Sequence, residues 1–324
     1  MKREPVRARN RDGRAPLAAG RLHRNAHGGR LGAGCACSLG FFAGKILKLS
    51  KETVARLLIY ILAPAVNFYG IFTLDFHASL LFLPLTYFCL SLVTCGIGYA
   101  LASRFWRDAH RNILGFTSGT GNTGYFGFPV AIAIFGEKAL GLMVLGSLGA
   151  VIYENTVGFF LVARGHHDAR ESVMRVLTLP TIYAAAIGLV CNLAGLHLPV
   201  PVNDMFVSAR GAYTILGAMM VGLGLVGASS FRIDGRFTGI AFLLKFLVWP
   251  ALMLALMHID AMTAHLFSSD VRNILLLLSI VPLAANTVAF ATELNTEPEK
   301  AATAVFLSTF FALFFIPFMV VMFF

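Results

Sequence analysis

The residues best suited to chemistry lie in a segment that is otherwise apolar enough to cross a membrane. The run "GTGNTGYFGFPV", residues 119–130, contains four glycines, an asparagine and a proline. Proline removes a backbone donor and clashes with the preceding turn, and glycine permits an unwound backbone. Irregular backbone survives at membrane depth only when it is buried in protein or lines a wet cavity. The run therefore predicts a broken membrane helix that builds a binding site.

A second run, "VPLAANTVAF" at residues 281–290, combines a proline and an asparagine in a similar way. Each amide can fill a hydrogen-bond position that the break vacates, or offer its N–H groups to a ligand. The new helical N-termini carry partial positive charge, which favours an anion. The competing interpretation is tight helix packing at the glycines, with the asparagines bonded to neighbouring helices. The candidate substrate-binding residues are Asn67, Asn122, Thr123, Gly124, Pro129, Pro282 and Asn286.

Two charged residues interrupt apolar runs, Glu154 in "VIYENTVG" and Lys245 in "FLLKFLVWP". A lone charge at the bilayer centre costs roughly 2.5–3.5 kcal/mol on insertion scales, so such residues usually face the protein interior and pair. Both are expected near the break. One interpretation is a charge relay, with Lys245 as a fixed cation and Glu154 as the titrating group. The other is a structural ion pair, or separate hydrogen bonds to the carbonyls of the broken helix.

The composition is that of a polytopic membrane protein. The 324 residues are 57% hydrophobic and 13% charged, whereas about a quarter of a soluble domain is charged. The net charge of +10 comes mainly from the first thirty residues, so no nucleic-acid partner is expected. Cys35 and Cys37 lack further ligands, His166-His167 has no partner motif, and no nucleotide-binding "GxxxxGK[ST]" occurs. We therefore expect neither a metal, nor a cofactor, nor an enzymatic activity.

Charged residues divide the chain into windows of about the ~20 residues that a transmembrane helix needs. The clear windows are 57–74, 78–103, 112–136, 139–163, 176–203, 211–231, 237–259, 273–292 and 301–324, and residues 31–44 form a weaker first candidate. Numbered from that candidate, the loops after odd helices carry thirteen Lys/Arg, and those after even helices carry only Lys138, Arg210 and Arg272. The positive-inside rule then places the odd loops in the cytoplasm and both termini outside it.

The basic N-terminal tail conflicts with that orientation, because its nine Lys/Arg and two acids would have to cross the membrane. The tail also lacks the continuous apolar core of a signal peptide. Residues 1–37 are therefore interpreted either as a basic, disordered extension or as a segment that is not the natural beginning of this fold.

Three short strings recur at nearly one offset along the chain. "RNIL" occurs at 111–114 and 272–275, "NT" at 122–123 and 286–287, and "EKA" at 137–139 and 299–301. The collinear order predicts two five-helix halves. Because five is odd, the second half enters the membrane from the opposite side, which is typical of secondary transporters that bind their substrate near the midplane.

With "GNTGYFGFP" followed by "VPLAANTVAF", the chain from about residue 38 to 324 resembles the auxin efflux carrier family, in its short bacterial permease form. The resemblance implies an all-α fold of ten helices in a 5+5 inverted repeat, with broken helices 4 and 9 that cross at Asn122, Pro129, Pro282 and Asn286. It also implies a scaffold domain of helices 1, 2, 6 and 7, a mobile domain of helices 3–5 and 8–10, and small organic anions as substrates.

Several further expectations complete this interpretation. We expect the chain to divide into a tail at 1–37, a first five-helix repeat at 38–163, a cytoplasmic linker at 164–175 and a second five-helix repeat at 176–324. We expect alternating access of the elevator type, a location in the bacterial inner membrane, the lipid bilayer as surroundings, and a homodimer by analogy. The alternatives are a sodium-coupled symporter, with Glu293, Glu297 and Glu299 near the cation, and a membrane sensor that binds without transport.

Overall fold

The computed structural model describes residues 38–74, 81–136, 139–226 and 233–324, and every element in these ranges is helical. The expectations for residues 1–37 lie outside them. A first helix covers 38–46. The elements that follow are α2 (Lys51–Leu57), η1 (Leu58–Leu62), α3 (Ala63–Phe72), α4 (Phe82–Ala102), α5 (Ala109–Ser118), η3 (Thr123–Gly127), α6 (Phe128–Phe135), α7 (Ala139–Tyr153), η4 (Glu154–Gly158), α8 (Phe159–Ala163), α9 (Ala169–Leu177), α10 (Pro180–Leu193), α11 (Val200–Gly224), α12 (Gly235–Leu243), η5 (Leu244–Val248), α13 (Trp249–Met262), α14 (Ser269–Ile280), α15 (Asn286–Glu293) and α16 (Pro298–Phe323), where η marks a π-helical turn.

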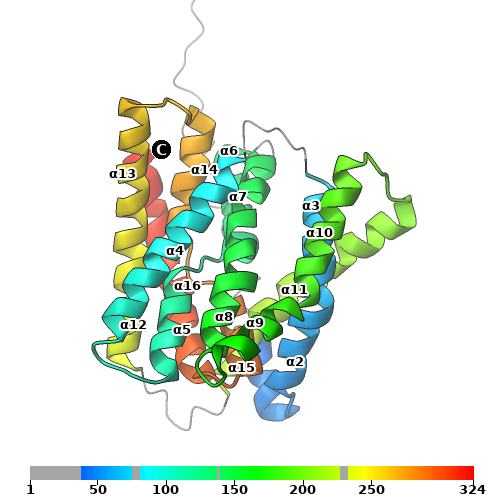
Figure 1. Ribbon diagram of the computed structural model, residues 1–324, viewed down its shortest axis with the longest axis vertical. Coiled ribbons are helices and arrows are strands. Elements are labelled where there is room, and N and C mark those ends of the chain that lie inside the picture. Colours follow the sequence, from blue (N-terminus) through cyan, green and yellow to red (C-terminus); the bar gives the residue numbers. More distant parts are fainter. Residues whose placement is uncertain (1–37, 75–80, 137–138, 227–232) are drawn as a thin grey trace, which may run out of the picture.

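The described helices form two groups, which Figure 1 shows side by side. In the scaffold group, α3 packs against α10 and α11. In the crossover group, α4 packs against α5 and α7, α14 packs against α7 and α13, and α16 packs against α12 and α15. Glycines allow the closest approaches: a Cβ at Gly149 would overlap the carbonyl oxygen of Pro84, and one at Gly188 would overlap that of Phe68. The two groups meet where α2 and α11 pack against α15 and α16.

Six described helices, counted through their π-helical turns, are long and apolar enough to cross a membrane. The bent pair α9 and α10, with 44° between its parts, makes a seventh if it is taken as one span. The windows 112–136 and 273–292 predicted two further spans, but each is divided into shorter helices, α5 with α6 and α14 with α15. The chain is thus a multi-pass all-helical protein, and the ten-helix inverted repeat remains a prediction.

Local sequence explains where several of these helices begin. Asp108, Asp168 and Asp234 cap α5, α9 and α12 by accepting hydrogen bonds from backbone N–H groups of the first turn. Such caps satisfy donors that have no partner within the helix. Pro180 and Pro298 stand at the first position of α10 and α16, where proline costs no hydrogen bond.

Two boundaries differ from those expected. The window 211–231 predicted a helix that begins after Arg210, but α11 begins at Val200 and places Arg210 inside a continuous helix of 25 residues. Arg210 is therefore not a loop residue. The uncharged windows end at Asp204 and Arg210, but α11 contains both of these charged residues. The boundaries of the windows are therefore not the boundaries of the helix. The linker expected at 164–175 likewise contains most of α9.

Candidate functional site

A cavity lies between the two groups of helices. It measures about 170 Å³, counted as the space that the centre of a water molecule can occupy. On that measure one water needs roughly 10–15 Å³, so the cavity has room for a small organic molecule. Its wall combines α3 and α11 of the scaffold group with residues of both helix breaks and of η4. The cavity is therefore lined by residues of both runs that the sequence analysis identified, 119–130 and 281–290.

The first break separates α5, which ends at Ser118, from η3, which begins at Thr123. Its freed carbonyls are satisfied by side chains from other helices. The Trp249 Nε1–H donates to the carbonyl oxygen of Ser118 at 2.8 Å, and the Lys245 ammonium donates to that of Thr120 at 3.0 Å. The Tyr153 hydroxyl donates to the carbonyl oxygen of Phe116 at 3.0 Å. Trp249 and Lys245 thus replace hydrogen bonds that a continuous helix would have formed, whereas the Phe116 carbonyl also accepts from the Gly119 N–H at 3.0 Å.

Lys245 belongs to this break and not to the cavity wall. Its side chain is 0% exposed, and its Nζ lies 4.5 Å from the centre of the Trp249 ring. The carbonyl end of a helix carries partial negative charge, so α5 stabilises a cation at this position. A Cβ on Gly121 would lie 2.9 Å from Lys245 Nζ and would overlap the Tyr87 hydroxyl. Glycine at 121 therefore leaves the space that the ammonium needs.

The second break, between Ile280 of α14 and Asn286 of α15, exposes backbone N–H groups instead. The N–H of Leu283 donates to the Ser308 hydroxyl at 3.1 Å, and the N–H of Ala284 donates to the Thr120 hydroxyl at 3.4 Å. The backbone N–H of Asn122 donates to the carbonyl oxygen of Pro282 at 2.7 Å. This last bond joins the two breaks directly, although they are far apart in the sequence.

Glu154 meets the second break from the side of η4. The Asn286 amide donates to its carboxylate Oε2 at 2.9 Å, and the Tyr213 hydroxyl of α11 donates to the Asn286 Oδ1 at 2.9 Å. Glu154 is only 4% exposed, yet it lines the cavity. The described residues contain no ion pair between Glu154 and Lys245. Each instead bonds to one break, which is the arrangement of separate hydrogen bonds.

The other predicted site residues take different positions. Asn122, Thr123, Gly124 and Asn286 line the cavity. Asn67 also lines it, but its amide donates to the carbonyl oxygen of Ala63, one turn earlier in the same helix, at 2.8 Å. Pro129 is the second residue of α6, and Pro282 lies within the second break. The structure thus brings the residues of the two runs together, and their role in binding stays a prediction.

Two residues of α11 were missed by the sequence analysis, Arg210 and Tyr213. Both line the cavity, and the Arg210 guanidinium carbon lies 5.4 Å from the centre of the Phe128 ring. The available signal was proline at position 201, a favourable first-turn residue that could have moved the predicted start of this helix before Arg210.

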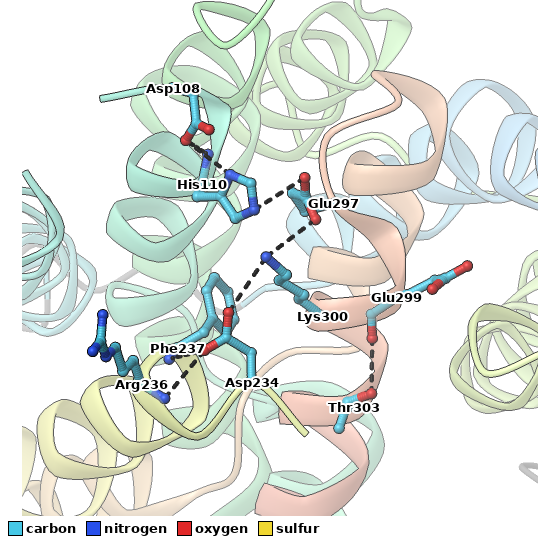
Figure 2. A network of polar contacts seen from close by, with 9 residues as sticks. All are labelled: Asp108, His110, Asp234, Arg236, Phe237, Glu297, Glu299, Lys300 and Thr303. Atoms are coloured by element: carbon cyan, nitrogen blue, oxygen red, sulfur yellow. Dashed lines mark hydrogen bonds and ion pairs between the residues drawn. The ribbon is translucent and has the colours of Figure 1, made fainter. Parts of the chain in front are cut away.

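A polar network joins the ends of α5, α12 and α16 on one side of the molecule (Figure 2). His110 contacts Asp108 at 2.8 Å and Glu297 at 3.1 Å, and Lys300 bridges Glu297 and Asp234. Burial raises the pKa of Asp234, but hydrogen bonds from the Phe237 N–H and Lys300 outweigh it and hold the pKa below its usual value. These contacts tie the ends of three helices of the crossover group to one another.

The remaining acidic residues at this end have different surroundings. Glu293 forms an ion pair with Arg56 at 3.2 Å, which links α15 to α2 of the scaffold group. The contact that Figure 2 marks for Glu299 is made by its backbone oxygen, which accepts from the Thr303 hydroxyl at 2.8 Å. In the described ranges, no three His, Cys, Asp or Glu residues are grouped in a way that could hold a metal ion. Sodium coupling through Glu293, Glu297 and Glu299 stays a prediction.

Comparisons with known proteins place the chain among membrane transport proteins. A family model described as "Membrane transport protein" matches residues 34–320. An uncharacterized transporter of Methanocaldococcus jannaschii is 25% identical over 290 residues, which cover 85% of this chain and 91% of the relative. An uncharacterized transporter of Methanothermobacter thermautotrophicus is 22% identical over 288 residues, which cover 86% of this chain and 92% of the relative.

Proposed function

Because this chain belongs to the membrane transport protein family, which includes the auxin efflux carriers, we propose that it is a secondary transporter of small organic anions. Family membership makes it a membrane transporter and not an enzyme. The proposed binding site is the cavity beside the two helix breaks. The observation that carries the proposal is the bond from the Asn122 N–H to the Pro282 carbonyl, which brings both breaks to one cavity of suitable size.

The chemistry of the wall favours an anion. Asn122 and Asn286 bring amides to the cavity, and η3, which continues into α6, and α15 begin beside it with their partially positive ends. Partly apolar walls from α3, α7 and α11 suit the carbon skeleton of an organic substrate. A small carboxylate combines the two properties.

The division into two groups supports alternating access of the elevator type. The crossover group carries both breaks, and the network of Figure 2 ties together the ends of three of its helices. The scaffold group contributes α3 and α11 to the opposite wall. In the proposed cycle, the crossover group moves past the scaffold group and carries the substrate with it. The contact between Arg56 and Glu293 has to break during that motion.

The proposed orientation has the basic loops in the cytoplasm, at the inner membrane of a bacterium. The ends of α4, α9, α12 and α15 that adjoin these loops lie together at one end of the molecule (Figure 1). Arg104, Arg170 and Arg236 belong to that end, as the positive-inside rule requires of cytoplasmic loops.

The test is a current measurement on proteoliposomes attached to a solid-supported membrane, with mono- and dicarboxylates offered in turn. We expect a substrate-specific current that persists without sodium and is lost in Asn122→Ala. That variant keeps the backbone bond to Pro282, so it changes the side chain at the cavity and leaves the link between the breaks. A sodium requirement would favour the symporter, and binding without current would favour the sensor.

A further inference from the structure

Arg210 is a positively charged residue of the scaffold group in the wall of the cavity. It lies within α11, and its guanidinium faces the ring of Phe128, the first residue of α6, at 5.4 Å. Both residues line the cavity. The side chain is half-buried, so its charge is neither sealed in the core nor fully exposed to the surroundings. Arg210 therefore places a cation at the boundary between the scaffold group and the first break.

The charge of Arg210 is not balanced by an acidic residue in the described ranges. None of the ion pairs there includes Arg210. The other charged residue among the described residues of the cavity wall is Glu154, which accepts its hydrogen bond from Asn286. A charge inside a membrane-spanning segment is costly, and it is kept where it pairs or meets a substrate.

Lys245 provides the contrast that makes this assignment specific. It is the more deeply buried cation, but its ammonium is bonded to the Thr120 carbonyl and lies over Trp249. It is absent from the described cavity wall. Lys245 thus completes a hydrogen bond of the protein itself, whereas Arg210 lines the cavity.

We propose that Arg210 pairs with the carboxylate of the transported anion and that the cavity is built for one such group. The inference rests on the proposed function, and it names the residue and the substrate class. A guanidinium offers a planar fork that matches a carboxylate with two parallel hydrogen bonds, which an ammonium does not. A second carboxylate would find no second basic side chain in the described wall and would share the cavity with Glu154. Monocarboxylates are therefore preferred over dicarboxylates of similar length.

The experiment measures the apparent affinity for a panel of matched mono- and dicarboxylates, from the concentration dependence of the currents and from thermal stabilisation by each compound. The variants are Arg210→Gln and Arg210→Lys. Phe128→Leu removes the ring under the guanidinium and keeps the charge. Arg236→Gln is the matched control, because Arg236 lies 5.8 Å from the centre of the Phe105 ring in a similar stack but does not line the cavity.

We expect Arg210→Gln to weaken monocarboxylate binding roughly 10- to 100-fold, as the loss of a charge-assisted pair implies. Arg210→Lys is expected to recover part of the affinity, because it keeps the charge but loses the fork. Arg236→Gln should stay within about threefold of the parent, well below the tenfold change that one charge-assisted bond implies. Phe128→Leu alters the cavity wall beside the guanidinium and is expected to weaken binding less than Arg210→Gln does. If Arg210→Gln does not fold, the weakened affinity of Arg210→Lys carries the test.

Three results would overturn the inference in distinguishable ways. If the parent protein transports a carboxylate and both Arg210 variants bind it with unchanged affinity, Arg210 is not the anchor, and the proposed function stands. If Phe128→Leu weakens binding as much as Arg210→Gln does, Arg210 acts by packing against Phe128 and not by pairing with the carboxylate. If the folded parent neither binds nor moves any anion of the panel, the inference falls together with the proposed function.

Discussion

The two helix breaks meet at one cavity and share the bond from the Asn122 N–H to the Pro282 carbonyl, but neighbouring helices complete them with different groups. At the first break, Lys245 and Trp249 donate to carbonyl oxygens that the break frees. At the second break the chain exposes N–H groups, and the hydroxyls of Ser308 and Thr120 accept from two of them. Each break has one helix that ends and one that begins, so the difference lies in which groups the neighbouring helices bring to it.

This comparison explains the buried charges in terms of helix ends. Lys245 lies at the carbonyl end of α5, and Glu154 lies beside Asn286, the first residue of α15. A cation at the C-terminus of a helix and an acid at the N-terminus each agree with the helix dipole. A charged side chain thus donates to a backbone carbonyl at the first break, whereas neutral hydroxyls accept from the backbone N–H groups of Leu283 and Ala284 at the second.

The largest expected effect comes from removing the charged donor at the first break. Lys245→Met should lower the free energy of unfolding by roughly 3 kcal/mol, because the Thr120 carbonyl would be buried without its partner and the contact with Trp249 would be lost. Ser308→Ala removes one acceptor at the second break and should cost about 1 kcal/mol. Unfolding in mixed micelles by titration with SDS, followed by circular dichroism, measures both. Equal losses would contradict the contrast between the breaks.

Alanine substitutions at two glycines of the first break test the packing around Lys245. In Gly121→Ala the added Cβ would meet the Lys245 ammonium and the Tyr87 hydroxyl, so we expect a loss of roughly 1–3 kcal/mol. In Gly124→Ala the Cβ would meet no atom within 4 Å, and the free energy of unfolding should change by less than about 0.5 kcal/mol. The same SDS titration compares them. A larger loss at Gly124 than at Gly121 would argue against the packing around Lys245.

A smaller effect is expected from pH at the network of Figure 2. The folded pKa of Asp234 is lowered from 3.8, so the folded state binds this proton less readily than the unfolded state. Its contribution to stability is complete above the unfolded pKa and is lost as the pH falls through the folded pKa. Thermal unfolding of the parent should therefore lose more stability between pH 6 and pH 3 than that of Asp234→Asn, with Asp270→Asn as control. Identical pH profiles for the parent and Asp234→Asn would remove Asp234 from this role.

The smallest effect concerns the contact between the two groups. Arg56 is 69% exposed on its side chain, so its ion pair with Glu293 contributes at most about 1 kcal/mol. Arg56→Gln should leave thermal unfolding nearly unchanged and shift the balance between the two orientations of the crossover group. Cysteine accessibility on either side of the membrane measures that balance. Arg175→Gln, which removes an ion pair on α9 with Glu171, is the control.

The sequence analysis identified residues of both helix breaks but placed the start of α11 wrongly. Asn122 and Asn286 could be found because glycine and proline in an apolar run disturb the backbone wherever the rest of the chain lies. Arg210 could not be found in the same way, because its charge was assigned to a loop when α11 in fact begins at Val200. Which donor satisfies which carbonyl depends on packing between distant segments, so the pairing of Lys245 with Thr120 could not be predicted from either segment alone.

The most direct test of the account is a structure of the protein with the carboxylate that gives the largest current. The account predicts density for that carboxylate in the cavity beside Asn122 and Asn286, with its charged group toward Arg210 and with Lys245 still bonded to the Thr120 carbonyl. Density bound away from the two breaks, or a carboxylate bonded to Lys245 in place of Thr120, would contradict it.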